Sequence, residues 1–280
     1  MNETARREFL RMVASYQDRG DPTGWFDKVY RDAQGDIREI VWADLVPNPH
    51  LVSWLEEHPI PDKSLRAVIV GCGVGDDAEA LSAHGYRIVA FDISPTAIDM
   101  CRKRYPDSSV DYRVADLFDY PRNWTRGFDL VFECNTIQAL PGEFRARALN
   151  AIADMVAPGG TVLVSCRSRR AGEKEDEFPL PLDRAEIDGF VRAGLSEDAF
   201  EAYDDNQDPP IPHFFACYSR PVECEHEIWK IPAACLGTVP SSGCRRDFAA
   251  ENCIAPVPVW ASFASLVRLA LPSLRPRISK

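Results

Sequence analysis

The stretch Val68-Ile-Val-Gly71-Cys-Gly73-Val-Gly75-Asp-Asp77 constrains this chain of 280 residues more than any other. The apolar run over residues 67–70 predicts a buried parallel strand. Three alternate glycines then predict a sharp turn, because a backbone without Cβ can bend tightly and admit a ligand closely. A helix is predicted over residues 77–84, so its free N–H groups face whatever lies above the turn.

A second predicted strand, residues 87–91, ends in Asp92, about 20 residues after the first glycine. In Rossmann-like units a carboxylate at this place holds ribose hydroxyls, so the two features together predict an adenosine-containing cofactor. The spacing is G-x-G-x-G rather than the G-x-G-x-x-G of dinucleotide folds. Asp76 and Asp77 would also repel a pyrophosphate but tolerate a sulfonium and an amino group. A nicotinamide-dependent oxidoreductase is therefore the less favoured alternative.

Strands and helices alternate from residue 66 onward, which predicts a parallel sheet with helices on both faces. Ligands of such sheets bind at the carboxyl ends of the strands. We therefore expect Gly71, Asp92, Asp116 and Glu133 to line one crevice, although Asp116 could instead cap a helix. The expected strands are 67–70, 87–91, 110–114, 128–133, 161–166, 196–203 and 213–219, and the expected helices after residue 66 are 77–84, 95–105, 142–156 and 183–193.

The two ends of the chain differ from this central part. Residues 1–60 are helical in pattern and predict a cap, in which Trp25 and Trp42 lie in turn-rich segments and are interpreted as parts of a lid. Trp54 is interpreted as a core residue. Residues 61–221 would form the cofactor-binding core. Residues 222–280 hold four of the nine cysteines and many prolines, and are expected to be a poorly ordered extension.

Charge and cysteine usage limit the classes of partner and site. A net charge of −11 argues against a nucleic-acid partner, which would need a basic face. No signal peptide is evident, and the apolar stretch 259–271 is too short and too interrupted to span a bilayer. The cysteines form no C-x-x-C pair, so we expect free thiols in a reducing cytoplasm and no metal site.

Three groups of motifs carry a family resemblance. They are Trp42-Ala-Asp44 with Pro49-His-Leu51, then the glycine turn with Phe91-Asp92-Ile-Ser94, and Phe128-Asp-Leu-Val-Phe-Glu133-Cys134 with Glu143-Phe-Arg145. In these motifs residues 20–220 resemble the thiopurine, thiol and halide methyltransferase group within the class I S-adenosylmethionine-dependent methyltransferases. Cys134 stands where that group has tyrosine, and Tyr30 is nearest its second N-terminal tryptophan. These departures leave the methyl acceptor open.

The resemblance implies a fold, a cofactor and a set of site residues. The fold would be α/β, a Rossmann-like, doubly wound and mostly parallel sheet with a C-terminal antiparallel hairpin. S-adenosyl-L-methionine would be the cofactor, and Arg145 would lie near the substrate side. The cofactor-contacting positions would be Trp25, Trp42, Gly71, Gly73, Gly75, Asp92, Ile93, Asp116, Leu117 and Cys134.

The expected function is methyl transfer to a small molecule, most simply to a thiol, or to a halide or selenide. We reach it because no histidine offers a convincing general base, and a thiolate is already the nucleophile. A small-molecule O-methyltransferase is the first alternative, and a non-catalytic adenosyl-ligand-binding protein is another. A monomer is favoured over an oligomer.

Overall fold

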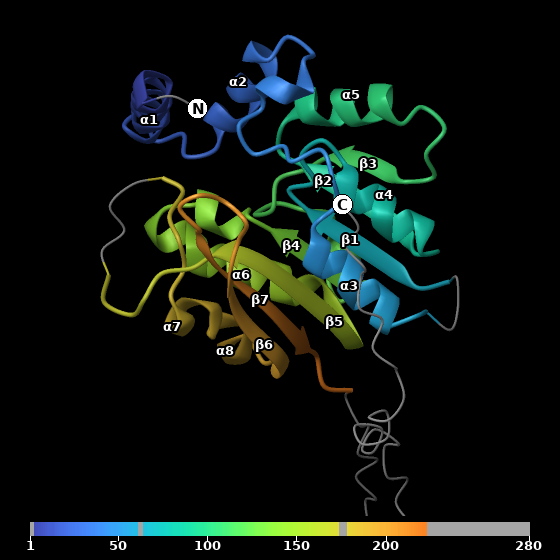
Figure 1. The fold of residues 1–280 in the computed structure, drawn as a ribbon. Coiled ribbons are helices and arrows are strands. Elements are labelled where there is room, and N and C mark those ends of the chain that lie inside the picture. The colour runs from blue at the N-terminus through green and yellow to red at the C-terminus, as the bar shows by residue number, and fades with distance from the viewer. Residues whose placement is uncertain (1–2, 61–63, 174–177, 223–280) are drawn as a thin grey trace, which may run out of the picture. The chain divides into compact units, whose positions relative to one another are not determined.

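Residues 3–60, 64–173 and 178–222 are described in a computed structural model of the chain (Figure 1). The expected extension, apart from its first residue, lies outside them, and the domain boundaries at residues 60 and 221 stay predictions. The helices are α1 Glu3–Gln17, α2 Gly24–Asp32, α3 Pro49–Glu57, α4 Asp76–Ala83, α5 Pro95–Arg104, α6 Gly142–Met155, α7 Arg184–Ile187 and α8 Gly189–Arg192, with short 3-10 turns at Ile37–Glu39, Arg122–Trp124 and Ile137–Ala139.

Within the described residues, seven strands form one sheet in the order β3-β2-β1-β4-β5-β7-β6. Strands β1 to β5 run parallel, and β7 lies antiparallel between β5 and β6. The predicted α/β fold with an antiparallel C-terminal hairpin and N-terminal helices is therefore confirmed. The strands are β1 Arg66–Val70, β2 Arg87–Asp92, β3 Asp111–Val114, β4 Phe128–Cys134, β5 Val156–Arg167, β6 Ser196–Asp204 and β7 Pro212–Ser219.

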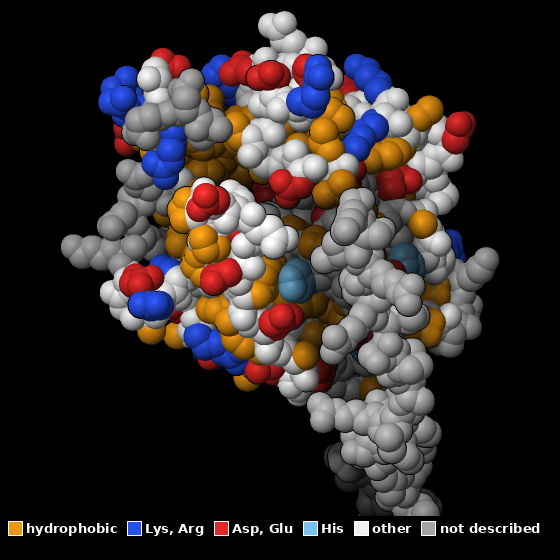
Figure 2. Space-filling view, in the orientation of Figure 1, with side chains coloured by type: hydrophobic (Ala, Val, Ile, Leu, Met, Phe, Trp, Pro, Cys, Tyr) orange, Lys and Arg blue, Asp and Glu red, His pale blue; other side chains and the backbone are white. Residues whose placement is uncertain are grey.

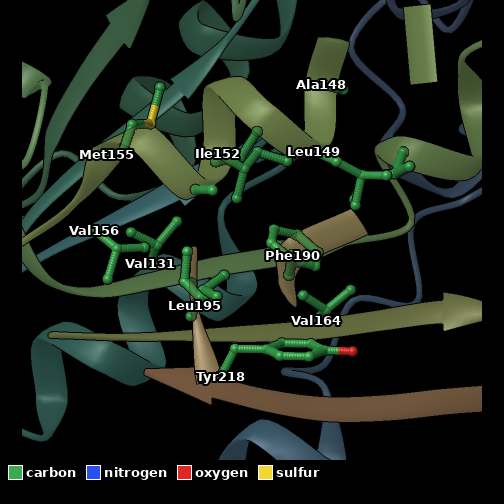
Figure 3. Packing of buried hydrophobic residues seen from close by; sticks show 14 of the residues in the cluster. Val131, Ala148, Leu149, Ile152, Met155, Val156, Val164, Phe190, Leu195 and Tyr218 are labelled. Carbon is green, nitrogen blue, oxygen red and sulfur yellow. The ribbon is translucent and has the colours of Figure 1, made fainter. Parts of the chain in front are cut away.

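Buried apolar side chains from alternate positions of the strands form a separate core on each face of the sheet. On one face β1 and β4 pack against α6, α7 and α8. On the other face they pack against α3, α4 and α5. Figure 3 shows the first of these cores, where Phe190 of α8 lies among Leu149, Val164 and Tyr218. This two-sided burial leaves the carboxyl ends of β1, β2 and β4 as the place where a ligand can reach the backbone.

Two predicted elements differ from the structure. The single helix expected over residues 183–193 is two short helices, α7 and α8, that meet at Asp188. A Cβ at Gly189 would approach Leu149 to 2.8 Å, so the glycine allows α8 to pack tightly on α6. Strand β5 begins at Val156, five residues before the expected start, and Val156 pairs with Phe128. The sequence did not predict this part of the strand because it contains two glycines, which are uncommon in strands.

No helix in the described part of the chain is long and apolar enough to cross a membrane. The apolar stretch 259–271, which the sequence predicts to be too short to span a bilayer, lies outside the described residues.

Replacing Phe190 by alanine should lower the free energy of unfolding by about 3–5 kcal/mol, because a fully buried ring leaves a cavity in the core under α6. Urea denaturation measures this loss. The neighbouring Val191 is 47% exposed, so Val191→Ala is the matched control and should change stability by less than about 0.5 kcal/mol. Equal effects of the two substitutions would show that α8 does not pack on the sheet as described.

Candidate active site

The glycine turn between β1 and α4 adopts a backbone that other residues rarely adopt. Gly71, Gly73 and Gly75 all have positive φ, at +63°, +56° and +95°. A Cβ at Gly71 would lie 2.4 Å from Oγ1 of Thr136, whose hydroxyl donates to the carbonyl of Val70. The turn is therefore closed on one side by Thr136, and its shape is fixed from within, because the N–H groups of Cys72 and Gly75 donate to the carbonyls of Phe91 and Cys72.

Asp92 ends β2 beside this turn and is nearly buried, with 6% of its surface exposed. Its Oδ2 accepts from the N–H of Gly73 (3.1 Å) and its Oδ1 from the N–H of Ser94 (2.9 Å). Burial raises the pKa of Asp92 to about 6, although these two hydrogen bonds favour the ionised form. The carboxylate is thus fixed in direction and keeps further acceptor capacity for hydroxyl groups.

Tyr30 and Trp42 lie over the turn from the N-terminal cap. The Trp42 indole N–H donates to the Tyr30 hydroxyl (2.9 Å), and that hydroxyl lies 3.5 Å from where a Cβ of Gly73 would be. Tyr30 is buried, and burial followed by the nearby Asp92 raises its pKa well above the ordinary value. A neutral phenol therefore covers the glycine turn. The sequence had pointed to Tyr30 only as a departure from the family pattern.

Trp25 does not lie in a turn, as the sequence suggested, but in α2, and it is fully buried. Its ring packs edge-on against Phe9 and Phe178 and stacks on Phe26, with centroid separations of 5.7, 5.0 and 3.9 Å. The interpretation of Trp25 as a lid residue is therefore corrected: it is the core of the cap. Trp42, which is only half-buried, touches this cluster from a turn.

Asp27 joins α2 to the start of α5. Its Oδ1 accepts from the Ser94 hydroxyl (2.7 Å) and from the N–H of Thr96 (3.2 Å). Burial opposes ionisation, but these bonds and Arg31 together hold the pKa of Asp27 below its usual range. Because Ser94 also binds Asp92, the cap and the end of β2 share one hydrogen-bonded group.

Ile93, Asp116 and Leu117 lie near the ends of β2 and β3. Ile93 is half-buried and Leu117 is buried in the core that faces α6. Asp116 is exposed, and its Oδ1 accepts from the N–H of Phe118 (2.8 Å) in a turn rather than at a helix. The helix-capping alternative for Asp116 is therefore wrong, and its role toward a cofactor stays a prediction.

Asn48 connects the cap to the opposite side of the crevice. Its backbone N–H donates to Oδ1 of Asp77 (2.7 Å), and its side-chain amide donates to Ser165 Oγ (3.1 Å) and Cys134 Sγ (3.5 Å). Its own Oδ1 caps α3 by accepting from the N–H groups of His50 and Leu51. The structure thus brings Cys134 and Asp77 together, which the sequence alone did not show.

Two of the carboxylates at the crevice carry raised pKa values because they are buried. Burial raises the pKa of Asp77 to about 6 and that of Glu133 to about 7. Glu133 Oε1 accepts from the N–H groups of Thr136 and Ile137. Its Oε2 accepts no hydrogen bond from the described residues, although it is fully buried. Asp77 keeps partial exposure, so of Asp77 and Glu133 it is Asp77 that a ligand can reach.

Arg145 is 3% exposed and lies in α6, where its guanidinium pairs with Glu186 and donates to the carbonyl of Leu180. Glu186 is shared with Arg169, which also pairs with Asp183. These contacts fix the segment between β5 and α7 to α6. The substrate-side role given to Arg145 by the resemblance stays a prediction.

Comparison with known proteins shows which family the sequence around this crevice is similar to. Residues 67–160 match a family model described as a methyltransferase domain. This region runs from β1 into β5 and contains the glycine turn, Asp92 and Asp77. Residues 67–160 are therefore similar to a methyltransferase domain, and the expected class I S-adenosylmethionine-dependent methyltransferase activity agrees with this match.

Curated relatives of this methyltransferase domain act on different atoms. A cypemycin N-terminal methyltransferase from a Streptomyces species is 29% identical over 167 residues, which are 56% of this chain and 65% of that protein. A ubiquinone biosynthesis O-methyltransferase from Thiobacillus denitrificans is 32% identical over 127 residues, which are 44% of this chain and 53% of that protein. The chain thus spans about half to two thirds of the length of these relatives.

Solved structures share the fold. The N-methyltransferase NodS from Bradyrhizobium japonicum, in complex with S-adenosylhomocysteine, has a TM-score of 0.54 at 18% identity, covering 70% of this chain and 100% of that one. A structure reported for the conversion of a disulfide bond into a thioacetal group during echinomycin biosynthesis has a TM-score of 0.58 at 22% identity, covering 72% and 94%. At these identities the likeness shows the fold alone.

The cofactor of the methyltransferase domain is S-adenosyl-L-methionine, and the residues of the crevice fit it. Gly71, Gly73 and Gly75 all have positive φ, which makes the kind of turn over which a cofactor can approach the backbone. Asp92 offers a fixed carboxylate for ribose hydroxyls. Asp77, a carboxylate in the first turn of α4, would tolerate the amino group of the methionine part of the cofactor.

Replacing Asp92 by asparagine should weaken S-adenosylhomocysteine binding by about 1.5–3 kcal/mol, because a hydrogen bond to a charged acceptor is lost. Calorimetric titration measures the affinity. The exposed Asp111 is the control, and Asp111→Asn should bind as the unmodified protein does. Unchanged affinity in folded Asp92→Asn would place the ribose elsewhere.

Binding should also depend on pH through Asp92. Its pKa of about 6 lies above the ordinary value of about 4, so the folded chain holds this proton more tightly than the unfolded chain does. The contribution of Asp92 to the free energy of unfolding therefore falls as pH rises from about 4 to 6, while its ability to accept ribose hydrogen bonds is lost as pH falls below about 6. Titrations at pH 5, 6 and 7.5 should show affinity falling at low pH, and less steeply in Asp92→Asn, where Asp77 still titrates. Equal slopes in the two proteins would contradict this assignment.

Proposed function

We propose that this chain transfers a methyl group from S-adenosylmethionine to a small-molecule acceptor. The observation that carries the proposal is the glycine turn closed on one side by Thr136, flanked by Asp92 and covered by Tyr30. The curated relatives, which are N- and O-methyltransferases by name, support the same reaction type. Because the chain matches only part of their length, the activity is proposed and not transferred from them.

Within this reaction the cofactor supplies an electrophilic methyl group on its sulfonium. The work left to the protein is to hold the acceptor in line, which in well-oriented systems contributes about 7–11 kcal/mol to lowering the barrier. Tyr30 and Trp42 would exclude water above the turn. An aromatic face close to a sulfonium adds about 0.5–2 kcal/mol, depending on desolvation.

A thiol acceptor, or a halide or selenide, is the finer form of the proposal. It is supported by the motif resemblance over residues 42–145. It is also supported by the state of the histidines near the crevice: His50 stacks on Tyr203 and lies 3.6 Å from Glu201, and His213 bonds the carbonyl of Ile211. An anionic thiolate needs no base, so such an acceptor would suit a site without a free imidazole.

An amine or hydroxyl acceptor is the second candidate, and Asp77 favours it. This carboxylate has a pKa of about 6, keeps one oxygen outside the Asn48 hydrogen bond and lies near Cys134. A carboxylate with a raised pKa can take a proton from an acceptor near neutral pH. The names of the curated N- and O-methyltransferases agree with this candidate.

The two forms are separated by offering methyl-labelled S-adenosylmethionine with thiophenol, phenol and benzylamine. If the acceptor is a thiol, thiophenol should be methylated, and Asp77→Asn should leave kcat unchanged within about twofold, since no proton needs to be removed. If the acceptor is an amine or hydroxyl, Asp77→Asn should lower kcat by about 10²–10⁴-fold.

Asp76→Asn is the control, because Asp76 pairs with Arg104 and Tyr105 on the outer side of the same helix turn. Binding of S-adenosylmethionine without transfer to any acceptor in a broad panel would favour the non-catalytic alternative. Failure to bind the cofactor at all would contradict the proposed function.

A further inference from the structure

Arg167, the last residue of β5, differs from the other buried and half-buried arginines of the described chain. Six of those arginines donate to carboxylates or backbone carbonyls, namely Arg66, Arg104, Arg145, Arg169, Arg184 and Arg220. The side chain of Arg167 is half-buried, yet its guanidinium donates to no group within the described residues. Its backbone N–H, in contrast, is held by Gln138 Oε1 at 2.5 Å.

The strand register places Arg167 beside the crevice. Cys134 pairs with Ser165 across β4 and β5, and Arg167 follows Ser165 by two residues on the same face of the sheet. Two residues along a strand are about 7 Å. Arg167 also pairs with His213, which pairs with Tyr203, so these three side chains form one row across β5, β7 and β6.

The described charged side chains near the Arg167 guanidinium act on it only electrostatically and accept no hydrogen bond from it. Asp44 and Asp205 are near enough to favour its charged form, and Arg6 opposes it, but burial dominates and lowers the pKa of Arg167. Asp44 is also an electrostatic neighbour of Asp77, so Arg167 and Asp77 share one acidic neighbour. On the face shown in Figure 2, acidic side chains of the described residues are scattered among basic and apolar ones, so charge recognition on this face depends on individual groups.

A half-buried guanidinium without an ion pair is costly, and its fixed planar donors match a carboxylate or another oxyanion. We propose that Arg167 binds an anionic oxygen group of the methyl acceptor, and therefore that the acceptor is a small molecule bearing a carboxylate. This inference rests on the proposed function only where it identifies the bound anion as the methyl acceptor. Binding of an anion at Arg167 can be measured without turnover. Arg167 would then hold one end of the acceptor at the carboxyl end of β5, next to Cys134 at the carboxyl end of β4.

The probe is propionate, with propionamide as its neutral isostere, titrated by saturation-transfer NMR into protein saturated with S-adenosylhomocysteine. Propionate should bind more tightly than propionamide. Arg167→Ala should weaken propionate binding by about tenfold or more, because a charge-assisted pair is lost, and should leave propionamide unchanged. Arg167→Lys should retain part of the preference as a point charge. The exposed Arg122 is the matched control, and Arg122→Ala should behave as the unmodified protein.

Two results would overturn the inference. One is equal affinity for propionate and propionamide in the unmodified protein. The other is that Arg167→Ala weakens S-adenosylhomocysteine itself and leaves propionate unchanged, which would assign the guanidinium to the cofactor carboxylate. If S-adenosylhomocysteine does not bind, the proposed function fails, and the comparison of propionate with propionamide on the free protein still decides the anion site.

Discussion

The hydrogen bonds of Asn48 hold the candidate site together. One residue caps α3, donates its backbone N–H to Asp77 at the start of α4, and reaches Cys134 and Ser165 at the ends of β4 and β5. All of these groups come from different segments of the chain. Because the half-buried amide of Asn48 makes all of these bonds at once, it links the cap, α4 and the sheet in one arrangement.

Burial of carboxylates is the second constraint on the site. Asp77, Asp92 and Glu133 come from three different elements and all have raised pKa values, near 6, 6 and 7. Taking several carboxylates out of water at one end of a sheet costs stability at neutral pH. The cost is tolerated where backbone N–H groups are aimed at the oxygens, as at Asp92 and at Glu133 Oε1. A cationic ligand would lower it further.

Local sequence rules predicted what depends on local chemistry. The glycine turn, Asp92 and the alternation of strands and helices follow from backbone freedom and hydrophobic period, and the sheet agrees with them. The predicted role of Trp25 was wrong because its burial comes from distant rings, those of Phe9 and Phe178. Asn48 and Arg167 were missed for the same reason, because the residues near them in the fold are distant in the sequence. Sequence spacing carries no signal for contacts of that kind without a fold to place them.

The bond from Asp27 to Ser94 has one more consequence. Ser94 gives its hydroxyl to Asp27 of the cap and its N–H to Asp92 of the ribose site. Swinging α2 away would remove that acceptor and loosen the end of β2 at the same time. Any opening of the cap would therefore be coupled to the hydrogen bonds of Asp92 through Ser94, and a ligand that favours one state of this pair would favour the matching state of the other. Ser94 is thus the one residue that contacts both Asp27 of the cap and the Asp92 carboxylate that we predict to bind the ribose.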